Sequence, residues 1–267
     1  MVNNSDRQWF EIIKHKDYLY VIRERLDEID PRFHTTYDNL FLIIGSHSAL
    51  LIDTGCGLFP LKPILSDLIK NKTLLVINTH SHFDHIGGNY EFDEILIHNE
   101  ELKSISMPTD VSFLQESPKE IVKRYESRKY TIQPANKIKS IKDMEIIDLG
   151  GMEAKVIHTP GHSKGSISLL TKGELFTGDV AHYGAMYISR EEFPTHLASI
   201  SRLLTFFQET KNIEIYPSHE EFAVGKDLLT DLSKGIQNIE NIWDSKVWDD
   251  FIEAWLISDE KFKYLVF

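Results

Sequence analysis

The sequence has little that would point to secretion or a membrane. Among its 267 residues there is one cysteine, Cys56, which excludes an intramolecular disulfide framework. No apolar run approaches the roughly 18 residues that span a bilayer, so we expect no membrane span. The opening residues, MVNNSDRQWF, lack the basic start and the apolar stretch of a signal peptide. We therefore expect a cytoplasmic protein.

Basic residues are outnumbered by acidic ones. The chain has 29 Lys and Arg against 41 Asp and Glu, a net charge of −12 at pH 7, which argues against general nucleic-acid binding. Its 42% hydrophobic and 26% charged residues are typical of a globular protein and exclude a disordered one. The length suits one domain over residues 1–267. An aromatic tail leaves a homodimer open as an alternative to a monomer.

Short β-rich runs occur in two series, with segments of helical periodicity between and after them. The runs are residues 19–23, 40–44, 49–52, 74–78 and 95–98, and then 145–149, 154–158, 166–171, 174–177 and 213–216. Helical spacing of apolar residues predicts helices over 60–70, 118–129 and 197–207, and a helical C-terminal tail near 222–267. A basic insertion occupies residues 104–142. Periodicity alone indicates an α/β or α+β fold.

One stretch carries a dense set of metal-ligand side chains. The run His80-Ser81-His82-Phe83-Asp84-His85 directly follows the predicted strand 74–78. Imidazole and carboxylate groups are ligands for borderline metals such as Zn²⁺, and so many of them are costly in an ordinary core. Alternate residues of an extended segment point the same way, so His80 and His82 can face one point. The sequence therefore predicts a metal site at this strand end.

Three further side chains repeat the pattern of a ligand that follows a β-rich run. They are His162 in TPGH, Asp179 in TGD and His219 in YPSH. Each alone is weak evidence, because a lone histidine after a strand is more often a surface or capping residue. Together, and in this order, they strengthen the prediction of a metal site.

These motifs resemble those of the metallo-β-lactamase-fold hydrolases. The resemblance rests on H-x-H-x-D-H at residues 80–85, T-P-G-H at 159–162, G-D at 178–179, the late His219, and Asp53 in IDTG. It covers roughly residues 19–220. It implies an αββα sandwich, with two mixed β-sheets flanked by helices, and a dinuclear metal site at one edge.

The resemblance also implies a role for each matching residue. His80, His82 and His162 would hold the first metal, Asp84, His85 and His219 the second, and Asp179 would bridge them. Asp53 would orient a ligand histidine, unless it is a helix cap or turn residue. Two Zn²⁺ ions are expected, with iron or manganese as alternatives. With a bridging hydroxide the site has a net positive charge, which suits attack on a carbonyl and a negatively charged tetrahedral intermediate.

Within the family, the sequence is most similar to a thioesterase-like branch that includes proteins associated with acyl-CoA hydrolysis. The residues that carry this similarity are IDTG with Gly57, THSHFDH with two following glycines, PGHSKGSI and GDV. The commonest zinc β-lactamases have cysteine where Asp179 stands, which disfavours that activity. A lactonase or glyoxalase II-like hydrolase, a mononuclear iron persulfide dioxygenase, and a non-catalytic metal-binding or scaffold protein remain as alternatives.

Substrate contacts are predicted from charge and position. Lys123, Arg124 and Arg128 belong to the basic insertion and could hold the phosphates of an acyl-CoA at the site mouth, or lie on a solvated helix face. Asp84 is a candidate proton shuttle. Tyr183 and His182 follow Asp179 and are candidates for contacts with a small-molecule substrate, or for packing in a loop.

Overall fold

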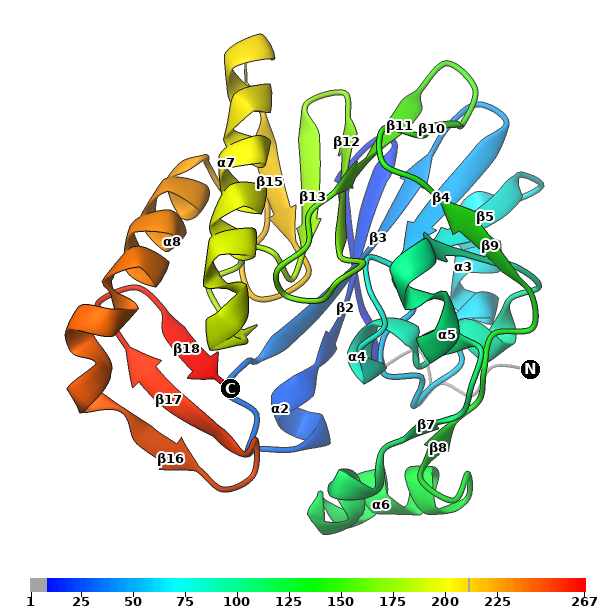
Figure 1. Ribbon diagram of the computed structural model, residues 1–267. Coiled ribbons are helices and arrows are strands. Elements are labelled where there is room, and N and C mark those ends of the chain that lie inside the picture. Colours follow the sequence, from blue (N-terminus) through cyan, green and yellow to red (C-terminus); the bar gives the residue numbers. More distant parts are fainter. Residues whose placement is uncertain (1–8, 211) are drawn as a thin grey trace.

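The computed structural model describes residues 9–210 and 212–267. Most of the opening stretch on which the signal-peptide prediction rests therefore lies outside the described residues. Figure 1 shows two β-sheets lying face to face, with helices on their outer sides. None of the helices in the described ranges is long and apolar enough to cross a membrane.

The first sheet combines antiparallel and parallel strands. Its order is β1-β2-β3-β4-β5-β6-β9, with antiparallel pairing from β1 to β4 and parallel pairing from β4 to β9. The strands are β1 (Glu11–Lys16), β2 (Leu19–Arg25), β3 (Tyr37–Ile44), β4 (Ser48–Ile52), β5 (Thr73–Ile77), β6 (Ile95–His98) and β9 (Ile138–Ile141). The parallel half needs crossover segments, and these include α3 (Lys62–Ile69), which joins β4 to β5.

The second sheet is also mixed. Its order is β10-β11-β12-β13-β15, and only the β13–β15 pair in it is parallel. The strands are β10 (Ile146–Asp148), β11 (Glu153–His158), β12 (Ile167–Thr171), β13 (Glu174–Gly178) and β15 (Glu214–Pro217). The long α7 (Phe193–Glu209) connects β13 to β15 after a short intervening segment, and α8 (Asp227–Asn238) packs beside it.

The core lies in three layers, as the apolar pattern of β3 illustrates. Phe41 and Ile43 point to the cluster between the sheets, whereas Leu40 and Leu42 point to the cluster on the outer side of the first sheet. Because β3 is buried on both faces, it appears in the sequence as a continuous apolar run. A third cluster lies between the second sheet and α7 and α8. The predicted αββα arrangement with two mixed sheets is therefore confirmed.

The prediction of a helical tail near 222–267 is wrong for the residues after 245. After α8 and a 3₁₀ turn (Ile239–Ser245) the chain forms β16 (Val247–Asp249), β17 (Ala254–Ser258) and β18 (Lys263–Val266). They join β14 (Ala185–Ile188) in a third sheet, in the order β14-β18-β17-β16. Asp249 accepts hydrogen bonds from the backbone N–H groups of Phe251 and Ile252, and this turn interrupts the apolar spacing that resembled a helix.

The basic insertion consists of short elements joined by loops, and it ends with strand β9 of the first sheet. It includes the end of α5 (Leu102–Ile105), the β7–β8 pair (Thr109–Asp110 and Thr131–Ile132), a 3₁₀ turn (Ser112–Glu116) and α6 (Lys119–Glu126). Short segments complete the fold: α2 (Leu26–Ile29), α4 (Phe83–Ile86), and 3₁₀ turns at Asn89–Glu91, Asn99–Glu101 and Arg190–Glu192. The helix predicted over 118–129 is present but shorter.

Candidate metal centre

The predicted metal ligands all follow the ends of strands from the two main sheets. The loop after β5 carries His80 and His82 and leads into α4, which contains Asp84 and His85. The loops after β11, β13 and β15 carry His162, Asp179 and His219. These segments lie far apart in the sequence, and the two sheets bring all seven side chains to one edge of the sandwich.

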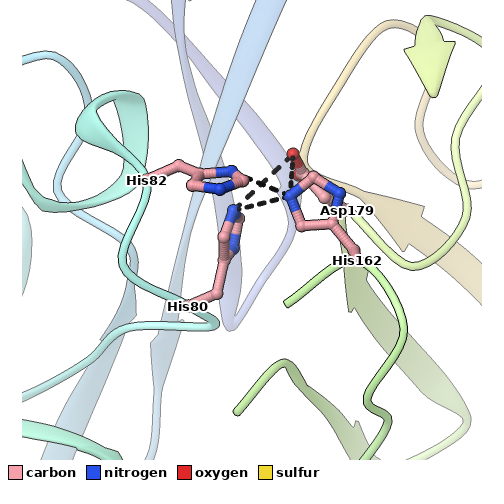
Figure 2. A group of neighbouring side chains, drawn as sticks. All are labelled: His80, His82, His162 and Asp179. Atoms are coloured by element: carbon pink, nitrogen blue, oxygen red, sulfur yellow. Dashed lines mark hydrogen bonds and ion pairs between the residues drawn. The ribbon is translucent and has the colours of Figure 1, made fainter. Parts of the chain in front are cut away.

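Three imidazoles converge in a first group (Figure 2). His162 Nε2 lies 3.1 Å from His80 Nε2 and 2.9 Å from His82 Nδ1. Asp179 Oδ2 lies 3.5 Å from His162 Nε2 and 3.8 Å from His80 Nε2. These four side chains place their ligand atoms within 4.8 Å of one another, which suits one metal ion with three nitrogens and one oxygen.

A second group shares Asp179 with the first. His85 Nε2 lies 3.4 Å from Asp179 Oδ1, and His219 Nε2 lies 3.2 Å from Asp179 Oδ2. Asp84 Oδ2 is 3.7 Å from His85 Nε2 and 3.6 Å from His219 Nε2. Asp179 therefore lies between the two groups, as a bridging carboxylate must.

Asp53 fixes the orientation of His85. This buried aspartate has a positive φ of 62° just after β4, and its Oδ2 lies 2.9 Å from His85 Nδ1. Its carboxylate also accepts hydrogen bonds from the backbone N–H and the hydroxyl of Thr79, at 2.7 and 2.8 Å. A donor bond from Nδ1 to a carboxylate leaves Nε2 free for a metal, and it fixes the ring orientation.

Close backbone contact fixes the position of α4. The N–H of Gly87 donates to the carbonyl of Gly55 at 2.7 Å, and the N–H of Thr54 donates to the carbonyl of His85 at 2.9 Å. A Cβ on Gly87 would lie 2.2 Å from the carbonyl carbon of Cys56, and one on Gly57 would lie 2.0 Å from the carbonyl oxygen of Gly87. The glycines at 57 and 87 are therefore needed for the approach of the two loops.

Burial and neighbouring charges shift the pKa values of the candidate ligands. Burial lowers the pKa of His80 well below its usual range, so this ring is neutral at pH 7. Burial opposes the charged form of His219 too, but the Asp179 carboxylate outweighs it and raises the pKa of His219 to about 10. Burial likewise opposes ionisation of Asp179, yet His219, His85 and His80 hold its pKa well below the usual range. A metal would replace the proton that His219 carries without it.

The residues present fit divalent metal ions. His85 Nε2 and Asp179 Oδ1 are buried and have no hydrogen-bond partner among the described residues, although both face the second group. His80 Nε2 and His82 Nδ1 both lie within hydrogen-bond distance of His162 Nε2, and these three nitrogens cannot all satisfy one another, because neutral imidazole has a single N–H. A cation at each group would satisfy these atoms, and histidine with carboxylate is the donor set that zinc accepts.

A cavity of about 640 Å³ opens onto this centre. The ligands that reach it include His82, Asp84, His162, Asp179 and His219. The rest of its wall is largely aromatic and aliphatic: Leu26, Phe33, Phe83, Phe113, Tyr187, Phe251, Ile252 and Phe267. No lysine or arginine is among the described residues that line it.

The predicted substrate contacts lie elsewhere. Tyr183 stacks on Phe262 with ring centroids 5.6 Å apart, and it does not line the cavity. His182 is buried behind His219, its ring centroid 4.9 Å from that of His219, and burial lowers its pKa to about 3. Neither side chain is placed to touch a substrate in this cavity. Tyr187, which the sequence did not single out, lines the cavity instead.

The basic side chains are placed on α6 and the segment after it. Lys123 is exposed and pairs with Glu120 at 2.8 Å. Arg124 lies over the ring of Phe59, 3.6 Å from its centroid, and Arg128 donates to the carbonyl of Gly57. None of the three lines the cavity, so a phosphate-binding role for them stays a prediction about the surface outside it.

Sequence reasoning also missed two buried acids beside the centre. Asp38 on β3 places a carboxylate oxygen within 4.8 Å of ligand nitrogens of His85 and His219, and neither of its oxygens has a hydrogen-bond partner among the described residues. Burial raises its pKa well above the usual range. Glu101 accepts hydrogen bonds from the loops that carry His82 and His162. No local motif marks either residue.

The fold and the ligand set define the class of protein. The sequence model of the metallo-beta-lactamase superfamily matches residues 36–219, which is more than half of the chain. The chain therefore belongs to this superfamily, and it is a metal-dependent hydrolase.

Individual relatives are similar over most of their length. The chain is 29% identical over 237 residues to acyl-coenzyme A thioesterase MBLAC2 of Homo sapiens, covering 80% of this chain and 82% of that one. It is 32% identical over 195 residues to the probable metallo-hydrolase MJ0888 of Methanocaldococcus jannaschii, covering 69% and 88%. A beta-lactamase domain protein from Burkholderia ambifaria shares the fold, with a TM-score of 0.66, 15% identity, and coverage of 88% and 79%.

Proposed function

We propose that the chain is a dinuclear zinc hydrolase that cleaves the thioester of an apolar acyl group, such as an acyl-CoA. The observation that carries this proposal is the aromatic wall of the cavity that opens onto the metal ligands. An apolar chain in such a cavity loses water-exposed surface, which contributes about 25 cal/mol per Å². The similarity to the thioesterase MBLAC2 supports the same substrate class.

The chain's own residues suit attack on a carbonyl. Zinc, when bound, supplies a nucleophile from water at neutral pH and polarises a carbonyl oxygen. Asp179 holds the two ligand groups together, and Asp84 reaches the cavity from the second group, where its carboxylate can accept a proton. The aromatic wall excludes water and orients the acyl chain toward the ligands.

No lysine or arginine is among the described residues that line the cavity, and this indicates which part of a substrate would enter it. A nucleotide leaving group with several phosphates requires cationic partners, whereas an acyl chain does not. The proposal therefore places the acyl chain inside the cavity and the thiol leaving group at its mouth.

The test is thiol release from a series of acyl-CoA substrates by zinc-loaded protein, with Asp179→Ala as the inactive control. We expect release that depends on metal and favours long chains. Phe113→Ala should raise the KM for a long-chain acyl-CoA about tenfold and leave that for acetyl-CoA unchanged, because Phe113 lines the cavity at 42% exposure.

Trp248→Ala is a matched control, since Trp248 is 45% exposed but does not line the cavity. It should change neither KM. Metal-loaded protein that releases no thiol from any acyl-CoA would contradict the proposal. Turnover of lactones or S-lactoylglutathione instead would show that the chain is a hydrolase with a different substrate class. Iron-dependent oxygen uptake with a persulfide would show that it is an oxygenase and not a hydrolase.

A further inference from the structure

One buried carboxylate connects the two loops that carry the first group of histidines. Glu101 lies in the 3₁₀ turn that follows β6, and it is only 5% exposed. Its Oε1 accepts hydrogen bonds from the hydroxyl of Ser163 and from the N–H of Gly165, each at 2.7 Å. Its Oε2 accepts a hydrogen bond from the hydroxyl of Ser81. All three donors belong to the metal-ligand loops.

These donors come from loops of two different sheets. Ser81 lies between His80 and His82 and follows β5 of the first sheet, whereas Ser163 directly follows His162, after β11 of the second sheet. A single carboxylate therefore joins loops from the two sheets at the point where their imidazoles meet. By contrast, Asp53 of the second group contacts Thr79 and His85, so it joins only segments that follow β4 and β5 of the first sheet.

The loop after His162 packs closely against Glu101. A Cβ on Gly165 would lie 2.5 Å from Cγ of Glu101, so glycine is required for the loop to close over the carboxylate. Ser163 is itself held by Ser166, whose Oγ accepts the N–H of Ser163 at 3.1 Å. The geometry around Glu101 is thus a packed, hydrogen-bonded connection and not a surface contact.

We propose that Glu101 is a positioning residue for the first metal: it holds His80 and His82 at the distance from His162 that one ion requires. Without a metal, three desolvated imidazoles at this spacing cannot all hydrogen-bond to one another, so their mutual contacts alone hold the two loops together only weakly. Residues that hold ligands in place before the metal binds raise the affinity for the metal, and their loss lowers that affinity 10–100-fold. This inference rests on the proposed metal centre but not on the proposed substrate.

The test compares two substitutions of Glu101. Glu101→Ala removes all three hydrogen bonds. Glu101→Gln keeps them, because its carbonyl oxygen can accept from Ser163 and Gly165 while its amide donates to Ser81, whose hydroxyl can turn to accept. The matched control is Glu100→Ala, since Glu100 is exposed and its carboxylate accepts a hydrogen bond from the neighbouring side chain of Asn99.

The readout is zinc affinity and stoichiometry, measured by competition with a chromogenic chelator, together with thermal unfolding of the metal-free protein. We expect Glu101→Ala to lose 10–100-fold in affinity for one of the two ions, Glu101→Gln to stay within about threefold of the parent chain, and Glu100→Ala to be unchanged. Should Glu101→Ala fail to fold, Ser81→Ala and Ser163→Ala each remove one arm of the connection, and each should lower the same affinity by a smaller factor.

Parent-like zinc affinity in Glu101→Ala, with only a lower unfolding temperature, would show a purely structural role and overturn the inference. So would an equal loss in Glu101→Gln, because that would indicate charge and not connection. A parent chain that binds zinc but hydrolyses no thioester would overturn the proposed substrate and leave the Glu101 inference intact.

Discussion

Tyr187 is the single residue whose substitution tests the chemistry of the cavity most directly. It lines the cavity from β14, and its backbone carbonyl lies 3.0 Å from His162 Nδ1, so the same residue orients a metal ligand and presents a phenol to the substrate. Burial, together with the carboxylates of Asp84, Asp249 and Asp179, raises its pKa above the usual range. The hydroxyl is therefore protonated at neutral pH and can donate a hydrogen bond.

Tyr187→Phe should lower kcat for the acyl-CoA about tenfold, which corresponds to roughly 1.4 kcal/mol of transition-state stabilisation. The backbone contact to His162 is kept, so zinc content should not change. Tyr183→Phe is the control, because Tyr183 stacks on Phe262 outside the cavity. Steady-state kinetics of both variants decide the matter: equal kcat values for Tyr187→Phe and the parent chain would remove Tyr187 from the mechanism.

At this scale, the sequence predicts the candidate ligands but not the side chains that surround them. The seven candidate ligands and Asp53 lie in short motifs, and their residue types and spacing are enough to predict them. The cavity wall is different, since Phe33, Phe83, Phe113, Phe251 and Phe267 come from segments that only the folded chain brings together. The sequence singles out Tyr183 and not Tyr187 for the same reason, because proximity to Asp179 along the chain does not show which way a side chain points.

At the scale of elements, the short helix α4 is positioned by backbone contact and not by a side chain. Asp84 and His85 lie in this helix, and its C-terminal Gly87 packs directly on the loop of residues 55–57. Gly87 has an ordinary helical φ of −58°, so its backbone conformation does not require glycine. The requirement comes only from the close approach.

Gly87→Ala should therefore lower the free energy of unfolding by about 1–3 kcal/mol, because the new Cβ meets backbone atoms of Cys56 that cannot turn aside. It should also lower affinity for the metal that Asp84 and His85 hold. Gly225→Ala is the control, since a Cβ there would have no atom within 4 Å. Denaturant unfolding and zinc stoichiometry give the answer, and a Gly87→Ala protein as stable as Gly225→Ala would contradict it.

Elements with a clear apolar periodicity were predictable from the sequence, and the three strands after α8 were not. The runs that became β2 to β6 and β10 to β13 are buried strands with apolar residues on one or both faces. In the tail, Trp248 and Trp255 have spacings that fit a helical face, yet they lie on paired strands β16 and β17. Turns at Asp249 and Asp259 redirect the chain there, and their side-chain hydrogen bonds are a local signal that periodicity overlooks.

For the whole molecule, the centre connects two halves of the sandwich. The first sheet supplies His80, His82, Asp84 and His85 through one loop and helix, and the second supplies His162, Asp179 and His219 through three loops. Metal binding at this place should therefore stabilise the contact between the halves, because an ion that binds only the folded chain shifts unfolding by mass action. With metals bound, this centre would be a positively charged site in a chain whose net charge is −12.

We propose that thioester hydrolysis requires two metal ions, one in each group of side chains. The most direct test adds zinc in known equivalents to metal-free protein and follows the initial rate of thiol release from a long-chain acyl-CoA. We expect the rate to rise until two equivalents of zinc per chain are bound, and we expect chelation to abolish it. Full activity at one equivalent, or no thiol release at any zinc content, would contradict it.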